Sequence, residues 1–174
     1  NCDAALLITF DEAKRLGMLL KARAPSLRHV STPDELRQVG EPGVSAFTPP
    51  TVAAGDIAFL QYTSGSTGAP KGVTLTHANL LANIRAMGVA LEATPDDVIV
   101  SWLPLYHDMG LIGSWLGGLY HACRIVIMPP LSFLARPSRW LWAVHRNRGT
   151  ISAAPNFAYE MCLRRIPEKD LEGL

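Results

Sequence analysis

A short stretch rich in hydroxyl and glycine residues, "LQYTSGSTGAPKG" at residues 60–72, ends with a lysine and a glycine. Glycines let backbone N–H groups converge on one point, and hydroxyls add hydrogen-bond donors that carry no charge. Lys71 adds a mobile cation to this set. Together these groups predict a loop that binds a polyphosphate. The alternative is a Ser/Gly-rich surface linker.

This loop is not a Walker P-loop, which requires the pattern GxxxxGK[ST]. Counted from Gly65, the glycine before the lysine is replaced by Pro70, and the residue after the lysine is Gly72 rather than Ser or Thr. The following segment, "GVTLT" at residues 72–76, has the pattern of a strand. The usual strand–loop–helix phosphate cradle therefore does not apply.

A second stretch, "SWLPLYHDMGLIG" at residues 101–113, leaves a predicted strand and enters a predicted helix. His107 and Asp108 follow the carboxyl end of that strand, where ligands bind in open α/β sheets. The alternative is that Asp108 caps the helix beginning at Met109 and that His107 is a turn residue with satisfied hydrogen bonds. The residues alone leave both readings open.

A third stretch, "TISAAPNFAYEMCLRRI" at residues 150–166, has a strand, a turn and a helix that begins with aromatic residues. These aromatic side chains could meet a ligand or pack into the core at the start of the helix. For Met161 and Cys162 we favour core packing.

The elements that must position these stretches alternate along the chain. Strands are predicted at residues 4–9, 27–30, 57–62, 72–76, 98–103, 124–128 and 150–154, and helices at 11–24, 77–91, 109–121, 137–148 and 155–165. Thr76 is expected to cap the second helix. Residues 41–55, rich in proline and glycine, are expected to be a linker. This alternation predicts an α/β fold with a largely parallel sheet.

Composition narrows the functional classes. The 174 residues are 48% hydrophobic and 18% charged, which is typical of a globular protein. A net charge of +1 argues against nucleic acid as a partner. The longest charge-free stretch is too short and glycine-rich for a membrane span. Three scattered cysteines without CxxC spacing argue against a disulfide framework or a zinc site and favour a reducing, cytoplasmic location.

The hydroxyl-rich stretch, "YTSGSTGAPKG", resembles the phosphate-binding signature of the adenylate-forming (AMP-binding) superfamily. This superfamily includes acyl-CoA synthetases, nonribosomal peptide adenylation domains, luciferases and fatty acyl-AMP ligases. In it, the loop embraces the β- and γ-phosphates of ATP. The resemblance implies an ATP phosphate-binding role for Thr63, Ser64, Gly65, Ser66, Thr67, Gly68 and Lys71.

The pattern "LPxYHDMGLIG" and the segment "PNFAY" resemble the fatty acyl-AMP ligase branch of this superfamily, as does "PLSFLARPSRWL" at residues 130–141, to which we assign no chemical role. The resemblance implies a pocket for the acyl chain or adenylate formed by His107, Asp108, Met109, Gly110, Asn156, Phe157 and Tyr159. Asp108 also remains compatible with a helix cap. Ala153 and Ala154 replace a Gly-Gly pair frequent in that branch, which bears on the shape of the pocket.

The resemblance runs over residues 56–166 and fits residues 1–55 only loosely. It implies that residues 1–174 are an internal part of the large N-terminal domain of an acyl-adenylate synthetase. The family's later motifs bind adenine, ribose and Mg²⁺ and supply a catalytic lysine, and none is found before Leu174. We therefore expect no complete catalytic set and no metal site in this chain, which should be inactive alone.

By resemblance, the parent enzyme activates a fatty acid with ATP and Mg²⁺, giving an acyl-adenylate and pyrophosphate. It then passes the acyl group to the phosphopantetheine thiol of an acyl carrier protein, commonly for polyketide or lipopeptide synthesis. Two alternatives stay open: a CoA-forming acyl-CoA synthetase and a non-catalytic module that binds acyl chains or nucleotide.

Overall fold

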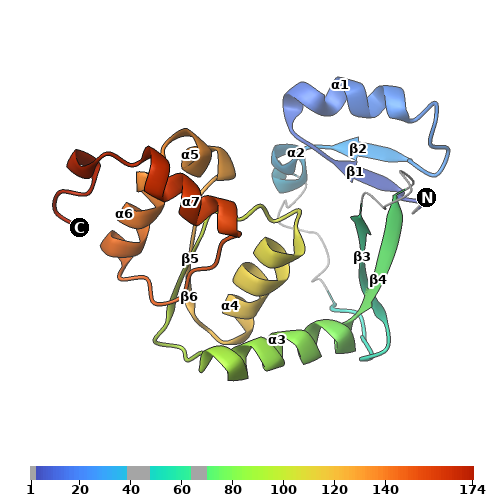
Figure 1. The fold of residues 1–174 in the computed structure, drawn as a ribbon. Coiled ribbons are helices and arrows are strands. Elements are labelled where there is room, and N and C mark those ends of the chain that lie inside the picture. Colours follow the sequence, from blue (N-terminus) through green and yellow to red (C-terminus); the bar gives the residue numbers. More distant parts are fainter. Residues whose placement is uncertain (1–2, 39–47, 64–69) are drawn as a thin grey trace. The chain divides into compact units, whose positions relative to one another are not determined.

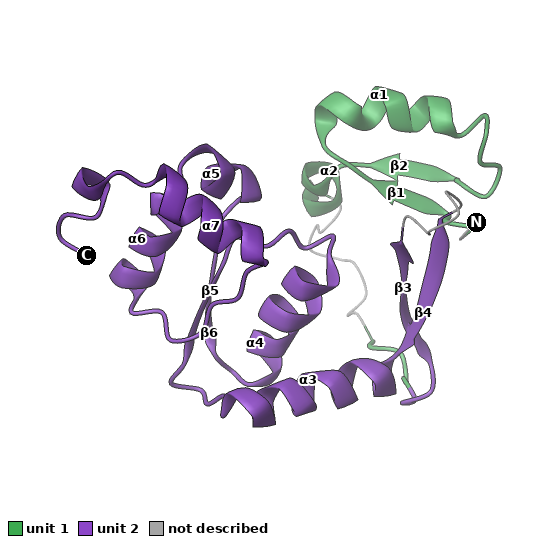
Figure 2. Cartoon of the chain, in the orientation of Figure 1, with its two compact units in different colours: residues 1–52 green, residues 53–174 purple. Residues whose placement is uncertain are grey.

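The computed structural model describes residues 3–38, 48–63 and 70–174 (Figure 1). The chain divides into two compact units, residues 1–52 and residues 53–174 (Figure 2). Both units combine strands with helices, which confirms the predicted α/β class. The described strands form three two-stranded sheets, of which two are parallel and one is antiparallel.

In the first unit, a helix connects two parallel strands. β1 (Leu6–Ile8) pairs with β2 (His29–Ser31), and α1 (Asp11–Leu20) runs between them in sequence. Gly17 lets α1 lie close to this pair, because a Cβ at that position would stand 2.8 Å from the Val30 side chain. The predicted elements are confirmed, although the helix ends at residue 20 rather than residue 24.

A short helix, α2 (Pro33–Gln38), lies outside the predicted elements. It begins with a capping box, in which Glu35 N donates to Thr32 Oγ1 (3.3 Å) and Thr32 N donates to the Glu35 carboxylate (3.2 Å). An ion pair with Lys14, followed by the hydrogen bond from Ser31, holds the pKa of Glu35 below its ordinary value. Residues 39–47 of the following segment lie outside the described residues, and residues 48–55 contain no strand or helix.

The second unit begins with a hairpin. β3 (Ile57–Thr63) and β4 (Lys71–Thr76) are antiparallel, with Thr63 paired to Lys71. The connection, residues 64–70, is too short for the crossover that parallel neighbours require. This hairpin is therefore the antiparallel exception to the largely parallel pairing that the alternating elements predict.

α3 (His77–Leu91) follows β4 directly. Asn79 N donates to Thr76 Oγ1 (3.2 Å), and Thr76 N donates to Asn79 Oδ1 (3.0 Å), so the predicted cap at Thr76 is confirmed as a capping box. Leu80 and Ile84, four residues apart, are buried and begin an apolar stripe on one side of α3.

A parallel pair lies at the centre of the second unit. β5 (Val98–Ser101) pairs with β6 (Arg124–Ile127), and Ile99 also bridges to Ile151. Within the described chain, this bridge is all that forms of the strand predicted at residues 150–154. The helix predicted at residues 109–121 forms as a π-helix, η1 (Met109–Leu116), followed by α4 (Gly117–Tyr120).

Helices α5 (Pro130–Ala135), α6 (Ser138–Asn147) and α7 (Asn156–Arg165) and a short 3₁₀ helix, η2 (Glu168–Asp170), complete the unit (Figure 1). The helices predicted at 137–148 and 155–165 are confirmed, whereas α5 lies outside the predicted elements.

The core of the second unit is aromatic. The buried residues in contact are Val100, Trp102, Leu103, Phe133, Trp140 and Ala158. The Trp102 ring stacks on Phe133 with centroids 4.0 Å apart. Burial raises the pKa of both the Cys123 and Cys162 thiols, and Met161 and Cys162 pack against the core as predicted. In the described ranges no helix is both long and apolar enough to cross a membrane.

Candidate functional site

The end of the β3–β4 hairpin carries the two described members of the predicted phosphate-binding set. Thr63 and Lys71 are register partners, and both are exposed. Pairing brings a hydroxyl and an ammonium group to one edge of the hairpin, a donor set that suits phosphate oxygens. The remaining predicted members, Ser64, Gly65, Ser66, Thr67 and Gly68, lie outside the described residues.

Beside this hairpin lies an open groove of about 820 Å³. Its walls come from β3, β4, α3, the turn before η1, and η1 itself. The lining residues are Gln61, Tyr62, Thr63, Val73, Leu75, Asn79, Leu80, Asn83, Met87, Tyr106, His107, Asp108, Met109, Ile112 and Gly113. The groove thus brings part of the phosphate stretch and part of the His-Asp stretch together, although they are distant in sequence.

A tight turn presents His107 and Asp108 to this groove. His107 N donates to the Pro104 carbonyl oxygen (3.1 Å), and Asp108 Oδ1 accepts from Met109 N (2.7 Å). Asp108 therefore acts as the N-terminal cap of η1, which was one of its two possible readings. Asp108 also lines the groove, so capping and ligand contact do not exclude each other.

The orientation of the His107 ring follows from the same carboxylate. His107 Nδ1 lies 2.6 Å from Asp108 Oδ1 and 3.3 Å from Met109 N, so the ring is held against the start of η1. Both side chains are more than half exposed, so this ring is accessible to a ligand in the groove.

Gly110 positions the turn rather than lining the groove. A Cβ on Gly110 would stand 2.3 Å from the Pro104 carbonyl oxygen, so only glycine allows this close approach. Below the turn, the buried Ser114 hydroxyl donates to Ser101 Oγ (3.1 Å), which in turn accepts from Leu103 N (3.2 Å). This network ties the end of β5 to η1 and holds the intervening turn.

The three remaining predicted pocket residues lie at the start of α7, and two of them contact rings of the aromatic core. Phe157 meets Trp102 edge-to-face at 6.1 Å, and the Tyr159 ring lies 5.6 Å from Trp140. Asn156 is the first residue of α7 and is exposed. None of the three lines the groove, so the structure divides the predicted pocket set between the groove and the start of α7.

Several groove residues are absent from the predicted site. Asn79, Asn83 and Met87 come from α3, and Tyr62 and Tyr106 flank the predicted residues. The sequence signal for α3 is the spacing of four between residues 79, 83 and 87, which places them on one helix face. No metal cluster lies among residues 3–38, 48–63 and 70–174, where no three His, Cys, Asp or Glu side chains could hold an ion.

Comparison with known proteins gives the class. Residues 1–174 match the family model described as AMP-binding enzyme, and the chain belongs to that family. This match includes residues 1–55, where the sequence resemblance is loose.

Relatives within the family include fatty-acid ligases. The medium-chain-fatty-acid–[acyl-carrier-protein] ligase TtuA of Teredinibacter turnerae is 42% identical over 131 residues, which are 75% of this chain and 20% of TtuA. The long-chain-fatty-acid–AMP ligase FadD26 of Mycobacterium marinum is 45% identical over 130 residues, 72% of this chain and 22% of FadD26. The chain thus spans about a fifth of the length of these relatives.

A solved structure shares the fold. It comes from work on fatty acyl-adenylate ligases from E. coli and L. pneumophila, and it superposes with a TM-score of 0.89 at 40% identity. The match covers 99% of this chain and 31% of the other. This match confirms the prediction that the chain has the fold of part of the N-terminal domain of acyl-adenylate synthetases.

Proposed function

We propose that this chain is the phosphate-binding and acyl-binding part of a cytoplasmic fatty acyl-AMP ligase. The parent enzyme activates a fatty acid with ATP and hands the acyl group to an acyl carrier protein. The observation that carries the proposal is the groove, which joins Thr63 on the phosphate hairpin to His107 and Met109 on the following stretch. The names of the relatives and of the solved structure support it.

The groove has a polar wall that suits the phosphate of an acyl-adenylate and an apolar wall that suits its acyl chain. Polar side chains of the hairpin, Gln61 and Thr63, line the groove, and Lys71 is the register partner of Thr63. Apolar side chains, Leu80, Met87 and Ile112, supply a wall for an aliphatic chain. An acyl-adenylate placed along the groove would have its phosphate near the hairpin and its chain against α3 and η1.

The chemistry needs positioning and charge neutralisation rather than a protein nucleophile. A carboxylate oxygen of the fatty acid attacks the α-phosphorus of ATP, and the bond to the β-phosphate oxygen breaks, so that pyrophosphate leaves with the electron pair. Lys71 and the hydroxyls of the hairpin would stabilise the charge on that leaving group. Mg²⁺ would supply further neutralisation when bound with ATP; among the described residues no group of three His, Cys, Asp or Glu side chains could hold the ion.

In the second half-reaction, a phosphopantetheine thiolate attacks the acyl carbonyl carbon, and AMP leaves with the electron pair of the broken carbon–oxygen bond. The turn carrying His107 would border the approach of this thiol. His107 is then a gate and pocket residue, held in orientation by Asp108.

The test uses the full-length protein with Mg·ATP, a medium-chain fatty acid, free CoA and a holo acyl carrier protein. Products are identified by mass spectrometry, with the apo carrier, which lacks the thiol, as the matched control. The proposal predicts that acyl-adenylate accumulates, ignores CoA and is consumed by the holo carrier alone. Acyl-CoA would assign a CoA-forming synthetase instead, and the absence of both products would favour a non-catalytic binding module.

A further inference from the structure

The segment "PLSFLARPSRWL", residues 130–141, has no role in the groove, and its apolar half is explained by packing. Phe133 is fully buried, and Trp140 is 4% exposed, and both belong to the aromatic core. Its polar residues are not explained in this way. Three of them, Arg136, Ser138 and Arg139, border a second cleft, of about 460 Å³, that shares no lining residue with the groove.

This second cleft, called here the arginine cleft, lies along α6. It is lined by Arg136, Ser138, Arg139, Trp142, Ala143, Arg146 and Asn147. Ser138 is buried and Trp142 is half-buried, while Arg139 and Arg146 are exposed. The cleft therefore combines exposed cations with one half-buried aromatic side chain.

One arginine of the cleft is already neutralised. Arg136 binds Asp170 through two hydrogen bonds (2.9 and 3.2 Å), and the Asp170 side chain is only 15% exposed. Trp142 Nε1 also donates to the Asp170 carbonyl oxygen (2.8 Å). Asp170 thus anchors η2 to the cleft and fixes its rim.

The other two arginines carry uncompensated charge. Neither Arg139 nor Arg146 forms an ion pair with a carboxylate of the described residues. The Arg146 guanidinium lies 5.0 Å from the Trp142 ring centroid, where the ring orients it without neutralising it. A third cation, Arg124, reaches the same end of the cleft and donates to Asn147 Oδ1 (3.0 Å).

The spacing of these residues makes a recognition face. Positions 139, 142 and 146 recur at intervals of three and four on α6, so they share one side of the helix. Arg and Trp are the residue types that most often dominate the binding energy of protein interfaces. Because the chain as a whole carries a net charge of only +1, the excess of cations here is local.

We propose that the arginine cleft docks an acidic surface of the acyl carrier protein, with carboxylate side chains of the carrier meeting Arg139 and Arg146. This inference rests on the proposed function, which requires such a carrier to reach the enzyme. The concave shape favours protruding carboxylates of a folded partner over a flat bilayer, which would need projecting apolar side chains. Charge complementarity of this kind governs encounter rates more than the chemistry that follows.

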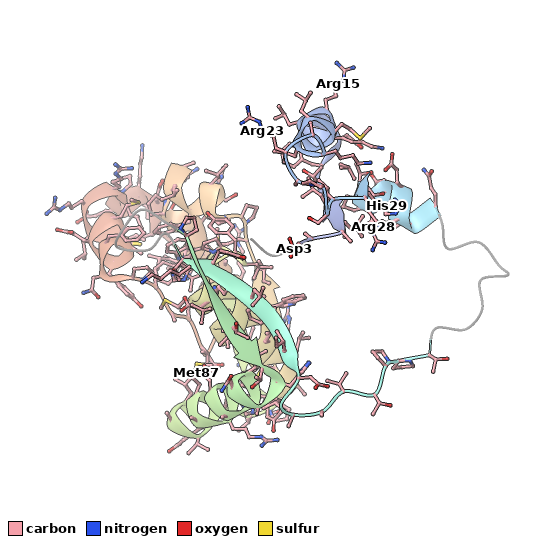
Figure 3. All side chains as sticks on the ribbon, turned by 90° about the vertical axis from the view of Figure 1, so that its right-hand side faces the viewer. Asp3, Arg15, Arg23, Arg28, His29 and Met87 are labelled. Atoms are coloured by element: carbon pink, nitrogen blue, oxygen red, sulfur yellow. The ribbon has the colours of Figure 1, made fainter. Side chains whose placement is uncertain are left out.

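The experiment compares two charge-reversed variants of the full-length protein. R139E/R146E alters the cleft, and R15E/R23E makes the same change in charge in the first unit, where both side chains extend outward (Figure 3). Three quantities are measured: adenylate formation without a carrier, the KM for the holo carrier in acyl transfer, and direct binding of the fluorescently labelled carrier. Pantetheine, a small thiol without a protein surface, serves as a control acceptor.

For R139E/R146E, the proposal predicts a rise of about tenfold or more in the carrier KM and dissociation constant, and a weaker dependence of both on salt. Adenylate formation and transfer to pantetheine should stay within about twofold of wild type, and R15E/R23E should resemble wild type. R139A/R146A should shift the KM in the same direction by less. A carrier with lysines in place of surface carboxylates should bind the R139E/R146E enzyme more tightly than it binds the wild-type enzyme.

An unchanged carrier KM in R139E/R146E would overturn the inference, as would an equal rise in R15E/R23E. Loss of adenylate formation in a folded R139E/R146E protein would overturn it too, because the cleft would then serve the first half-reaction. Binding to phosphatidylserine vesicles that depends on Arg139 and Arg146, without an effect on the carrier, would replace it with a membrane contact. If wild type forms no adenylate, the proposed function fails, and the direct binding measurement still decides the docking inference.

Discussion

The aromatic core and the groove meet in one continuous segment, yet they differ in exposure and in chemistry. Trp102 and Leu103 are 3% and 4% exposed, whereas Tyr106, a few residues later, is 86% exposed. The first part of the segment is fixed by stacking and burial, and the second part is held by hydrogen bonds and by one glycine. A single motif therefore both anchors the second unit and presents polar groups to solvent.

Truncation of a buried ring in the aromatic core should cause the greatest loss of stability. Phe133→Ala removes a fully buried ring that stacks on Trp102, so it should destabilise the chain by about 3–5 kcal/mol. Tyr106→Ala, the matched aromatic truncation in the groove, should change stability by less than about 0.5 kcal/mol. Urea unfolding of the 174-residue chain, followed by tryptophan fluorescence, measures both. Equal losses of stability in the two variants would contradict the distinction between a packed core and an exposed groove.

The second prediction concerns Lys71, on the hairpin beside the groove, and the rate of adenylate formation. Lys71→Met should lower the rate of adenylate formation by the full-length protein roughly 100-fold, because it removes a preorganised cation beside the leaving pyrophosphate. Lys169→Met is the matched control, since Lys169 lies on η2 and lines neither cleft. The rate of pyrophosphate release reports both. An active Lys71→Met variant would separate the hairpin from the phosphate chemistry.

The third prediction concerns Gly110, in the turn that joins the aromatic core to the groove. Gly110→Ala forces a Cβ against the Pro104 carbonyl, so the turn must shift, at a cost of about 1–3 kcal/mol. Gly113→Ala is the control within the same helix, because its Cβ would meet no atom within 4 Å. It should be neutral or stabilising by up to about 1 kcal/mol. Thermal unfolding of the two variants gives the difference, and equal behaviour would refute the role of Gly110.

The smallest expected effect concerns the turn before β5. Asp97 accepts hydrogen bonds from the Thr150 hydroxyl (2.7 Å), Thr94 N (2.8 Å) and the Thr94 hydroxyl (3.0 Å), which hold the pKa of this carboxyl below its ordinary value. Its contribution to stability is therefore present above the unfolded-state pKa of about 3.9 and is lost as the pH falls through the lower folded-state pKa.

We expect the stability advantage of wild type over Asp97→Asn to shrink as the pH falls from about 5 to about 2. Asp96→Asn, which alters the neighbouring carboxyl, is the matched control. Urea midpoints across this range measure both differences. A wild-type advantage that grows with acid would show that the sign of this linkage is wrong.

Much of the fold was predictable because local rules and tertiary packing agree. Thr76 caps α3 as its residue type predicts, and residues 99–103 are buried as their apolar run predicts. α2 was missed although Thr32 and Glu35 have capping-box spacing, because a helix this short shows little periodicity. The π-helical form of η1 could not be predicted from sequence periodicity, which does not separate it from an α-helix.

The candidate site was predictable in part, for a related reason. His107, Asp108 and Met109 share a groove with Thr63, as one site requires, but Asn79 and Asn83 depend on how α3 lies beside the hairpin. Met87, which Figure 3 labels on α3, looks from sequence like a core residue of the helix stripe, yet it lines the groove. Phe157 packs against Trp102, and no local pattern distinguishes that contact from one with a ligand.

A structure of the full-length protein bound to a non-hydrolysable acyl-adenylate analogue would test directly whether the groove holds the acyl-adenylate. The account predicts that the analogue lies in the groove. Its phosphate-mimicking group should lie within hydrogen-bond distance of Thr63 or Lys71, and its acyl chain should contact Met87, Met109 or Ile112. An analogue bound elsewhere, with the groove filled by another segment of the full-length chain, would contradict it.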